Sequence, residues 1–267
     1  MIKADFHLHS DFSSDSKTPM EEMVKQGIAL GLEQMCMTDH MDYDFPKQYN
    51  MPFEFDVDKY LETIEQLKNK YPAIKLRTGI EVGMRPYLSK RFTELVSSHP
   101  FDFVICSSHL LYDLDPYYKE TWIGREEKQV FRDYFEIILE NIKCFDNFDV
   151  YGHIDYVIRY SPSKGANFHP SEYMDILDEI LTTLIYKGKG IEANTSGYKY
   201  GMGGPHPRAA ILKRYLELGG EILTIGSDGH QPNHMAYDFN SAESLLKELG
   251  FKYYTVFENR KPAFIKL

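Results

Sequence analysis

The sequence alternates short apolar runs with longer amphipathic runs, and this alternation constrains the fold more than any other feature. Residues 34–38, 74–80 and 101–108 form apolar runs with the length and composition of buried strands. Residues 58–70 and 126–144 instead carry apolar side chains at helical spacing. Seven strand-then-helix units follow one another, and each helix returns the chain to begin the next strand in the same direction. The pattern predicts an α/β fold whose parallel sheet is closed, or nearly closed, into a barrel.

The length of the chain suits such a barrel. With 267 residues, of which 43% are hydrophobic and 26% charged, the chain can bury one large core, and α/β barrels commonly have about this length. No internal repeat, low-complexity segment or interdomain linker interrupts the alternation. We therefore predict a single domain over residues 1–267.

Charge and cysteine content limit the partners and the location. The formal net charge of -10, from 40 acidic and 30 basic residues, disfavours nucleic acid and membrane surfaces as partners, although it allows a local anion site. No apolar stretch has the length of a membrane span, and charged residues within the first apolar run argue against a signal peptide. Cys36, Cys106 and Cys144 lie among apolar neighbours, so we expect buried, reduced thiols and a cytoplasmic protein.

Histidines gather where the predicted strands end. In His7-Leu8-His9 two imidazoles on one strand could bind the same metal ion, but two exposed polar positions would produce the same pattern. Six of the ten histidines follow this placement, and two carboxylates share it, Glu81 and Asp228. The six are His7, His9, His40, His109, His153 and His230. In an α/β barrel, reactive side chains sit at this end of the strands.

Each of these residues alone could be a polar side chain that caps a strand. Together they would place many imidazoles and carboxylates at one rim, which is costly unless something binds them. A cluster of Zn, Mn or Fe ions is the simplest compensation, with Glu81 able to bridge two of them. Three divalent ions would exceed the charge of three carboxylates (Asp15, Glu81 and Asp228), so such a site favours an anion. A metal-activated water could then attack a phosphoryl group.

The same residues carry a resemblance that spans nearly the whole chain. Ordered motifs of the polymerase and histidinol phosphatase (PHP) superfamily are similar to His7-Leu8-His9-Ser10 with Asp15, Thr38-Asp39-His40, Glu81, Ser107-Ser108-His109, Gly152-His153-Ile154-Asp155 and Ser227-Asp228-Gly229-His230. The spacing and the segment 194–197 are most similar to its monofunctional histidinol-phosphate phosphatases. The resemblance implies a distorted seven-stranded (β/α) barrel of the TIM type with a trinuclear metal centre.

The resemblance also implies how the ligands divide among three divalent ions. The sets are His7, His9, Glu81 and Asp228 for the first ion; Glu81, His109 and His153 for the second; and Asp15, His40 and His230 for the third. By the same resemblance, a hydroxide that bridges the metal ions attacks phosphorus without a phosphoenzyme.

Candidates for substrate binding are cationic. Arg159, six residues after His153, could hold phosphate through a bidentate fork, the alternative being an ordinary surface arginine. Lys199 stands in a Gly-rich loop where similar phosphatases carry arginine, so it keeps the charge but loses the planar fork. His206 and Arg208 in the same loop could substitute for it, although helix capping explains both equally well.

The leading prediction is a metal-dependent phosphomonoesterase that hydrolyses L-histidinol phosphate in histidine biosynthesis. The alternatives are a PHP phosphoesterase for another phosphomonoester or a small phosphodiester, and a non-catalytic metal-binding module. No proposed ligand position holds a non-ligating residue, which argues against the module. Asp228 and His230 are the nearest candidates to protonate the leaving alkoxide, but a metal ligand is a weak general acid. The native metals, the proton donor and the oligomeric state stay open.

Overall fold

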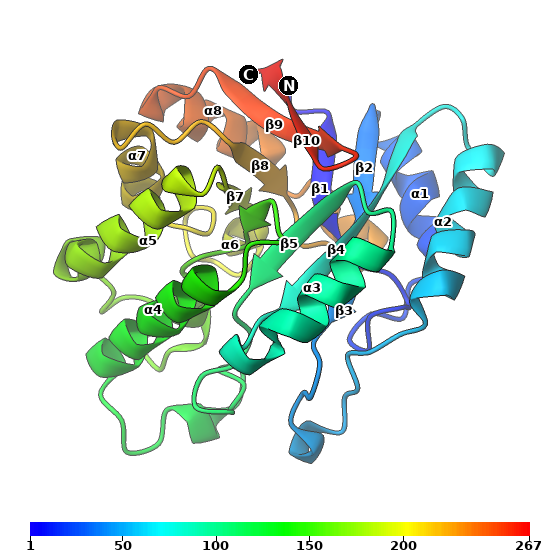
Figure 1. Cartoon of the computed structure of the whole chain (residues 1–267). Helices are drawn as coiled ribbons and strands as arrows, with labels where there is room; N and C mark the ends of the chain where they lie inside the picture. Colours follow the sequence, from blue (N-terminus) through cyan, green and yellow to red (C-terminus); the bar gives the residue numbers. More distant parts are fainter.

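Seven parallel strands form the wall of a barrel in the computed structural model, which describes residues 1–267 (Figure 1). In order around the wall they are β1 (Ala4–Leu8), β2 (Gln34–Met37), β4 (Lys75–Gly83), β5 (Phe103–Ser107), β6 (Val150–Tyr151), β7 (Gly190–Asn194) and β8 (Leu223–Gly226). The first and last strands approach each other just beyond their ends, where Leu8 and Gly229 form a parallel bridge. The predicted, nearly closed (β/α) barrel is therefore confirmed.

Eight α-helices accompany the strands and lie mainly on the outside of the barrel (Figure 1). They are α1 (Met20–Ala29), α2 (Val57–Lys70), α3 (Ser89–Ser98), α4 (Glu127–Cys144), α5 (Met174–Tyr186), α6 (Ser196–Lys199), α7 (Ala209–Glu217) and α8 (Phe239–Leu249). Local chemistry sets some of their ends: the Asp56 carboxylate accepts a hydrogen bond from Lys59 N at the start of α2, and Gly250, with φ of 104°, ends α8. No helix is long and apolar enough to cross a membrane.

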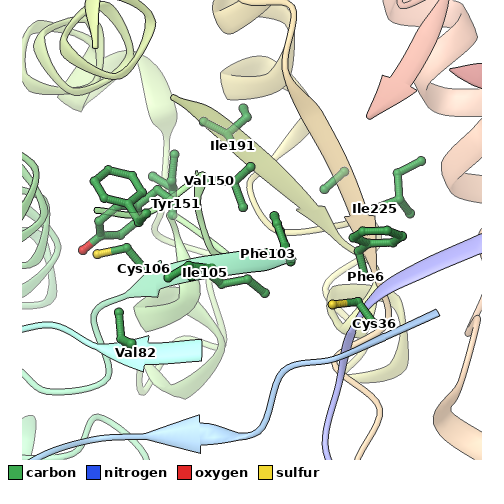
Figure 2. Close-up of a cluster of buried hydrophobic side chains, with 14 of the residues drawn as sticks. Phe6, Cys36, Val82, Phe103, Ile105, Cys106, Val150, Tyr151, Ile191 and Ile225 are labelled. Carbon is green, nitrogen blue, oxygen red and sulfur yellow. The ribbon is translucent and has the colours of Figure 1, made fainter. Parts of the chain in front are cut away.

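The apolar strand residues form one continuous core. Figure 2 shows part of it, with Phe6, Phe103, Ile191 and Ile225 contributed by four different barrel strands. Phe6 and Phe103 pack edge to face with their ring centroids 5.5 Å apart. Burying one such ring stabilises the fold by roughly 1.5–3 kcal/mol.

The three cysteines do not share one environment. Cys36 and Cys106 lie in the core as predicted, but Cys144 is exposed at the end of α4. The prediction of a buried thiol at position 144 was therefore wrong. Apolar residues do surround Cys144 in sequence, but it occupies the last turn of a helix whose buried face is formed by other positions.

The last part of the chain lies outside the barrel. The expected strand at 253–257 is present as β9 (Tyr253–Glu258), but it pairs antiparallel with an unexpected strand, β10 (Lys261–Lys266). Phe257 of β9 stacks on Phe103 at 5.0 Å, so the hairpin packs against the core of the barrel. All of β10 is exposed and it contains Pro262, which explains why its sequence does not resemble a buried strand.

Several residues that were predicted to end or follow a strand lie within one. Glu81 is part of β4, His7 is part of β1, and His40 begins a short additional strand, β3 (His40–Met41), which pairs with β4. The register of that pair sets His40 directly beside Glu81. The pairing thus brings together two of the predicted metal ligands before any side-chain contact is considered.

Candidate metal centre

Glu81 stands at the centre of the histidine cluster. Its carboxylate is fully buried, with Oε2 3.1 Å from His7 Nε2 and 3.0 Å from His40 Nδ1. The other oxygen, Oε1, lies 3.2 Å from His109 Nε2 and 3.0 Å from His153 Nε2. One carboxylate therefore faces imidazoles from both sides, which is the arrangement required of a bridging ligand.

The remaining predicted ligands surround a second part of the cluster. Asp228 Oδ1 lies 3.4 Å from His9 Nε2 and 3.5 Å from His230 Nδ1. Asp15 Oδ2 lies 3.1 Å from His230 Nε2 and 3.7 Å from His40 Nε2. All nine side chains that the sequence analysis selected as metal ligands thus lie in one connected group.

The cluster contains buried polar atoms that lie close to one another but form no hydrogen bond. They are His7 Nε2, His9 Nε2, His40 Nδ1, His230 Nε2 and Glu81 Oε2. Leaving one buried polar atom unpaired costs about 1–3 kcal/mol. Imidazole nitrogen and carboxylate oxygen are ligands of Zn, Mn and Fe, so divalent ions fit the donor set.

Four groups of side chains are close enough to hold an ion. Three overlap the predicted sets: His7, His9 and Glu81; Glu81, His109 and His153; and His9, His40 and His230. The fourth consists of His40, Asp42 and His109 and was not predicted. The cluster can therefore hold several metal ions.

The chain's own charges favour ionised carboxylates in this cluster. Burial opposes ionisation of Glu81, but neighbouring imidazoles, those of His7 and His109 first among them, hold its pKa well below the usual range. Burial likewise opposes ionisation of Asp228, but neighbouring imidazoles, that of His9 first among them, hold its pKa well below the usual range. An ionised Asp228 fits the role of a metal ligand better than that of a proton donor.

The pKa values of the imidazoles differ according to the charges of their neighbours. Burial lowers the pKa of His40, but the carboxylates of Glu81 and Asp15 outweigh burial and raise it to about 9. The pKa of His9 is instead lowered well below its usual value by burial and by the neighbouring His230 and His40. A neutral imidazole such as His9 has a free lone pair for a metal ion.

Two carboxylates that sequence reasoning missed orient the ligands. Asp42 Oδ2 lies 2.6 Å from His109 Nδ1, and Glu192 Oε1 lies 2.6 Å from His7 Nδ1. A carboxylate on one ring nitrogen fixes the tautomer and directs the other nitrogen toward a metal ion. The available signal was the acidic residue itself, since Glu192 is the only charged residue in β7.

Arg159 borders the cluster. Its side chain is only 9% exposed, so the alternative of an ordinary surface arginine is excluded. Nη1 lies 3.2 Å from Ser196 Oγ and 3.8 Å from Asp228 Oδ2, and Nε is buried without a partner. The guanidinium also lies over the rings of Tyr156, Tyr160 and Tyr200, at 4.6, 4.7 and 4.4 Å from their centroids.

The other candidates for substrate binding occupy two different places. Lys199 Nζ lies 3.3 Å from His234 Nδ1, and burial lowers its pKa, while the charges of Asp228 and Arg159 also act on it. His206 Nδ1 instead lies 2.5 Å from Asp155 Oδ1. His206 thus holds its loop to the segment after β6 and caps no helix, and its contact with substrate stays a prediction.

Comparison with known proteins places this geometry in a family. The PHP domain matches residues 5–196 of the chain. The chain belongs to the PHP domain family. This PHP chain is 32% identical to a histidinol-phosphatase from Lactococcus lactis over 268 residues, which cover 98% of the chain and 96% of that protein. It is 34% identical to a protein from Clostridium acetobutylicum named as a probable histidinol-phosphatase, over 93% of the chain and 94% of that protein.

Solved structures agree with the sequence relatives. The crystal structure of histidinol phosphate phosphatase from Lactococcus lactis, complexed with zinc, L-histidinol and phosphate, matches this PHP chain with a TM-score of 0.89 over 98% of each chain. A Listeria monocytogenes structure matches with a TM-score of 0.78 at 19% identity, over 90% of this PHP chain and 99% of that one. At this low identity, the second match supports only the fold of this PHP chain and says nothing of its function.

Proposed function

We propose that this chain is a metal-dependent phosphatase that hydrolyses L-histidinol phosphate to L-histidinol and phosphate. The observation that carries the proposal is the buried cluster around Glu81, in which five nitrogen and oxygen atoms form no hydrogen bond and are close enough together to bind divalent ions. The Lactococcus lactis relative, 32% identical along 98% of the chain, supports the choice of substrate because its structure holds zinc, L-histidinol and phosphate.

Three ions would be held by the three sets that the PHP resemblance implies. His7 and His9 with Glu81 and Asp228 hold the first, and His109 and His153 with Glu81 hold the second. The third set is Asp15, His40 and His230. Asp228 and His230 lie beyond the residues 5–196 that the PHP domain matches, yet they complete the ligand sets. We therefore propose that residues 1–267 form one catalytic unit.

Arg159 would hold the phosphate. Its guanidinium donates to Ser196 Oγ and to Tyr160 Oη, which leaves other N–H groups for phosphate, and the aromatic rings around it fix its position beside Asp228. When bound, divalent ions supply an activated water and neutralise charge on the phosphoryl group. Lys199 adds a second positive charge at the same edge of the cluster. Asp228 and His230 are the candidate proton donors, and the low pKa of Asp228 makes it the weaker of the two.

The proposed substrate is a small molecule. The net charge of -10 argues against nucleic acid as a substrate, and Arg159 and Lys199 form a local cationic site beside Asp228. Cys36, Cys106 and Cys144 form no disulfide, which supports the cytoplasmic location that we propose for a biosynthetic enzyme.

A substrate panel tests the proposal. The metal-loaded protein should release phosphate from L-histidinol phosphate far faster than from p-nitrophenyl phosphate or bis-p-nitrophenyl phosphate. Similar rates on the two monoesters would contradict the substrate assignment. Faster hydrolysis of the diester would favour a phosphodiesterase, and no hydrolysis of any ester with a full metal complement would favour a non-catalytic module.

A further inference from the structure

Glu192 joins two of the ligand sets without belonging to either. It lies in the middle of β7, and its carboxylate is buried. Oε1 lies 2.6 Å from His7 Nδ1, whereas Oε2 accepts hydrogen bonds from His153 N at 3.0 Å and from Asn194 Nδ2 at 3.1 Å. His7 belongs to the first ligand set and His153 to the second. One carboxylate therefore contacts a residue of each set, at an atom (His7 Nδ1 or His153 N) that is not the proposed ligand atom.

The neighbouring strands leave space for this carboxylate. A Cβ atom on Gly226, at the end of β8, would overlap Glu192 Oε1 and His7 Cβ. A Cβ atom on Gly152, just after β6, would overlap the Ser107 hydroxyl group, which donates a hydrogen bond to Glu81. Glycine at both positions allows the closely packed arrangement of Glu192, His7 and Glu81.

The partners of Glu192 distinguish it from a buried carboxylate that serves only the fold. Asp149, at the other end of the barrel, accepts hydrogen bonds from Val104 N and from the Arg260 guanidinium, which compensates its charge. Glu192 contacts no lysine or arginine, and its ion-pair partner is the imidazole of His7. A carboxylate on one ring nitrogen of a metal-binding histidine directs the other nitrogen toward the ion, and the place of Glu192 behind His7 fits that role.

We propose that Glu192 is a positioning residue that couples the first and second ion sites. It keeps the proton of His7 on Nδ1, so that the lone pair of Nε2 points toward the first ion. Its second oxygen holds the backbone from which His153 reaches the second ion. This inference rests on the ligand sets of the proposed function but not on the proposed substrate.

Glu192→Gln tests the coupling because the volume is kept while one of the two oxygens is replaced by an NH2 group. The amide cannot accept from both His7 and His153 N, so one donor faces another donor. We expect zinc binding at both sites to weaken by about 10–100-fold. The measurement is zinc per chain by elemental analysis after equilibration with chelator-buffered zinc, with thermal unfolding of the metal-free protein as a check of folding.

Asp149→Asn is the matched control, since it changes another buried carboxylate, at the other end of the barrel from the cluster. It should lower the melting temperature and leave zinc binding unchanged. Wild-type zinc binding in Glu192→Gln would overturn the proposal, and so would an equal loss of zinc in both variants. Failure of the wild-type protein to hydrolyse L-histidinol phosphate would contradict the proposed substrate but leave these zinc measurements, and this inference, intact.

A measurement on the wild-type protein applies even if Glu192→Gln does not fold. Nitrogen-15 NMR of the zinc-loaded, histidine-labelled chain reports which ring nitrogen of His7 carries the proton, with His7→Gln used to assign the signal. A proton on Nδ1 supports the proposal. A proton on Nε2 would overturn it, because that nitrogen could not then bind the first ion.

Discussion

Asp102 and Glu81 are buried carboxylates at opposite ends of the barrel, and their surroundings differ. At the amino end, Asp102 accepts hydrogen bonds from Thr78 N at 3.0 Å and Asn259 N at 2.9 Å. At the carboxyl end, Glu81 Oε2 and His9 Nε2 are buried and form no hydrogen bond. Buried polar groups that the chain satisfies serve the fold, whereas those that it leaves unsatisfied indicate a ligand. The comparison thus locates the functional end without reference to any relative.

Among variants that test the difference between the two ends, Glu81→Ala should lose the most activity. Removing the carboxylate deletes the bridge between the first and second ligand sets, so kcat/KM for L-histidinol phosphate should fall by about 1000-fold or more. Steady-state phosphate release and elemental analysis measure the two consequences, lost turnover and lost metal. Asp102→Ala at the amino end is the control, with a lower melting temperature but near-normal kcat. Undiminished turnover in Glu81→Ala would contradict the metal centre.

A smaller loss is expected when the cation beside the cluster is changed. Arg159→Lys keeps the positive charge but removes the planar fork, so kcat/KM should fall by about 10–100-fold. The zinc content should not change, because Arg159 is not a ligand. Kinetics and elemental analysis on the same preparation separate the two roles. A loss of zinc equal to that of Glu81→Ala would assign Arg159 to the fold of the cluster.

The stability of the metal-free protein should depend on pH because of His40, at the carboxyl end of the barrel. Burial lowers the pKa of His40, but Glu81 and Asp15 raise it to about 9, above the usual value of 6.5. The protonated ring therefore stabilises the folded state below about pH 6.5, and this contribution is lost as the pH rises through about 9.

We expect metal-free protein to lose on the order of 1–3 kcal/mol of stability over that interval. Urea unfolding from pH 6 to pH 9.5 measures the loss. His40→Gln should flatten the pH dependence. Zinc-loaded protein should lack it as well, since zinc displaces the proton. An equally steep dependence in metal-free His40→Gln would assign the effect to other groups.

The smallest effect is expected from a substitution at the amino end of the barrel, and it should concern stability alone. Arg260→Met removes the cation that contacts Asp149 Oδ2 at 2.6 Å, but Val104 N still donates to that oxygen and the arginine side chain is 25% exposed. Stability should fall by about 1–2 kcal/mol, a decrease of several degrees in the melting temperature. Calorimetry measures this decrease. A change in kcat or zinc content would show that the two ends are not independent.

The main strands and the clustering of most candidate ligands could be predicted because each leaves a local signal. Apolar runs mark the strands, and His7, His109 and His153 each stand within two residues of the end of one, whereas Asp15 was included because of the family resemblance. Parallel strands that close into a barrel then bring these side chains together. The ligand geometry follows from this arrangement without knowledge of any individual distance.

The residues that escaped prediction depend on pairings between distant segments. In the sequence, Glu192 is a single polar residue in an apolar strand. Its contact with His7 follows only from the folded arrangement, in which β7 lies between β6 and β8. Asp42 is important because β3 pairs with β4 and brings it near His109, and β3 is only two residues long. The strand β10 is fully exposed, so it lacks the apolar pattern by which strands are recognised.

The central claim is that divalent ions satisfy the groups left unpaired around Glu81. The most direct test is elemental analysis of the wild-type chain before and after chelation, with hydrolysis of L-histidinol phosphate followed in parallel. We predict three divalent ions per chain, loss of hydrolysis when they are removed, and recovery when zinc or manganese is returned. Full hydrolysis by protein shown to be free of metal would contradict the account.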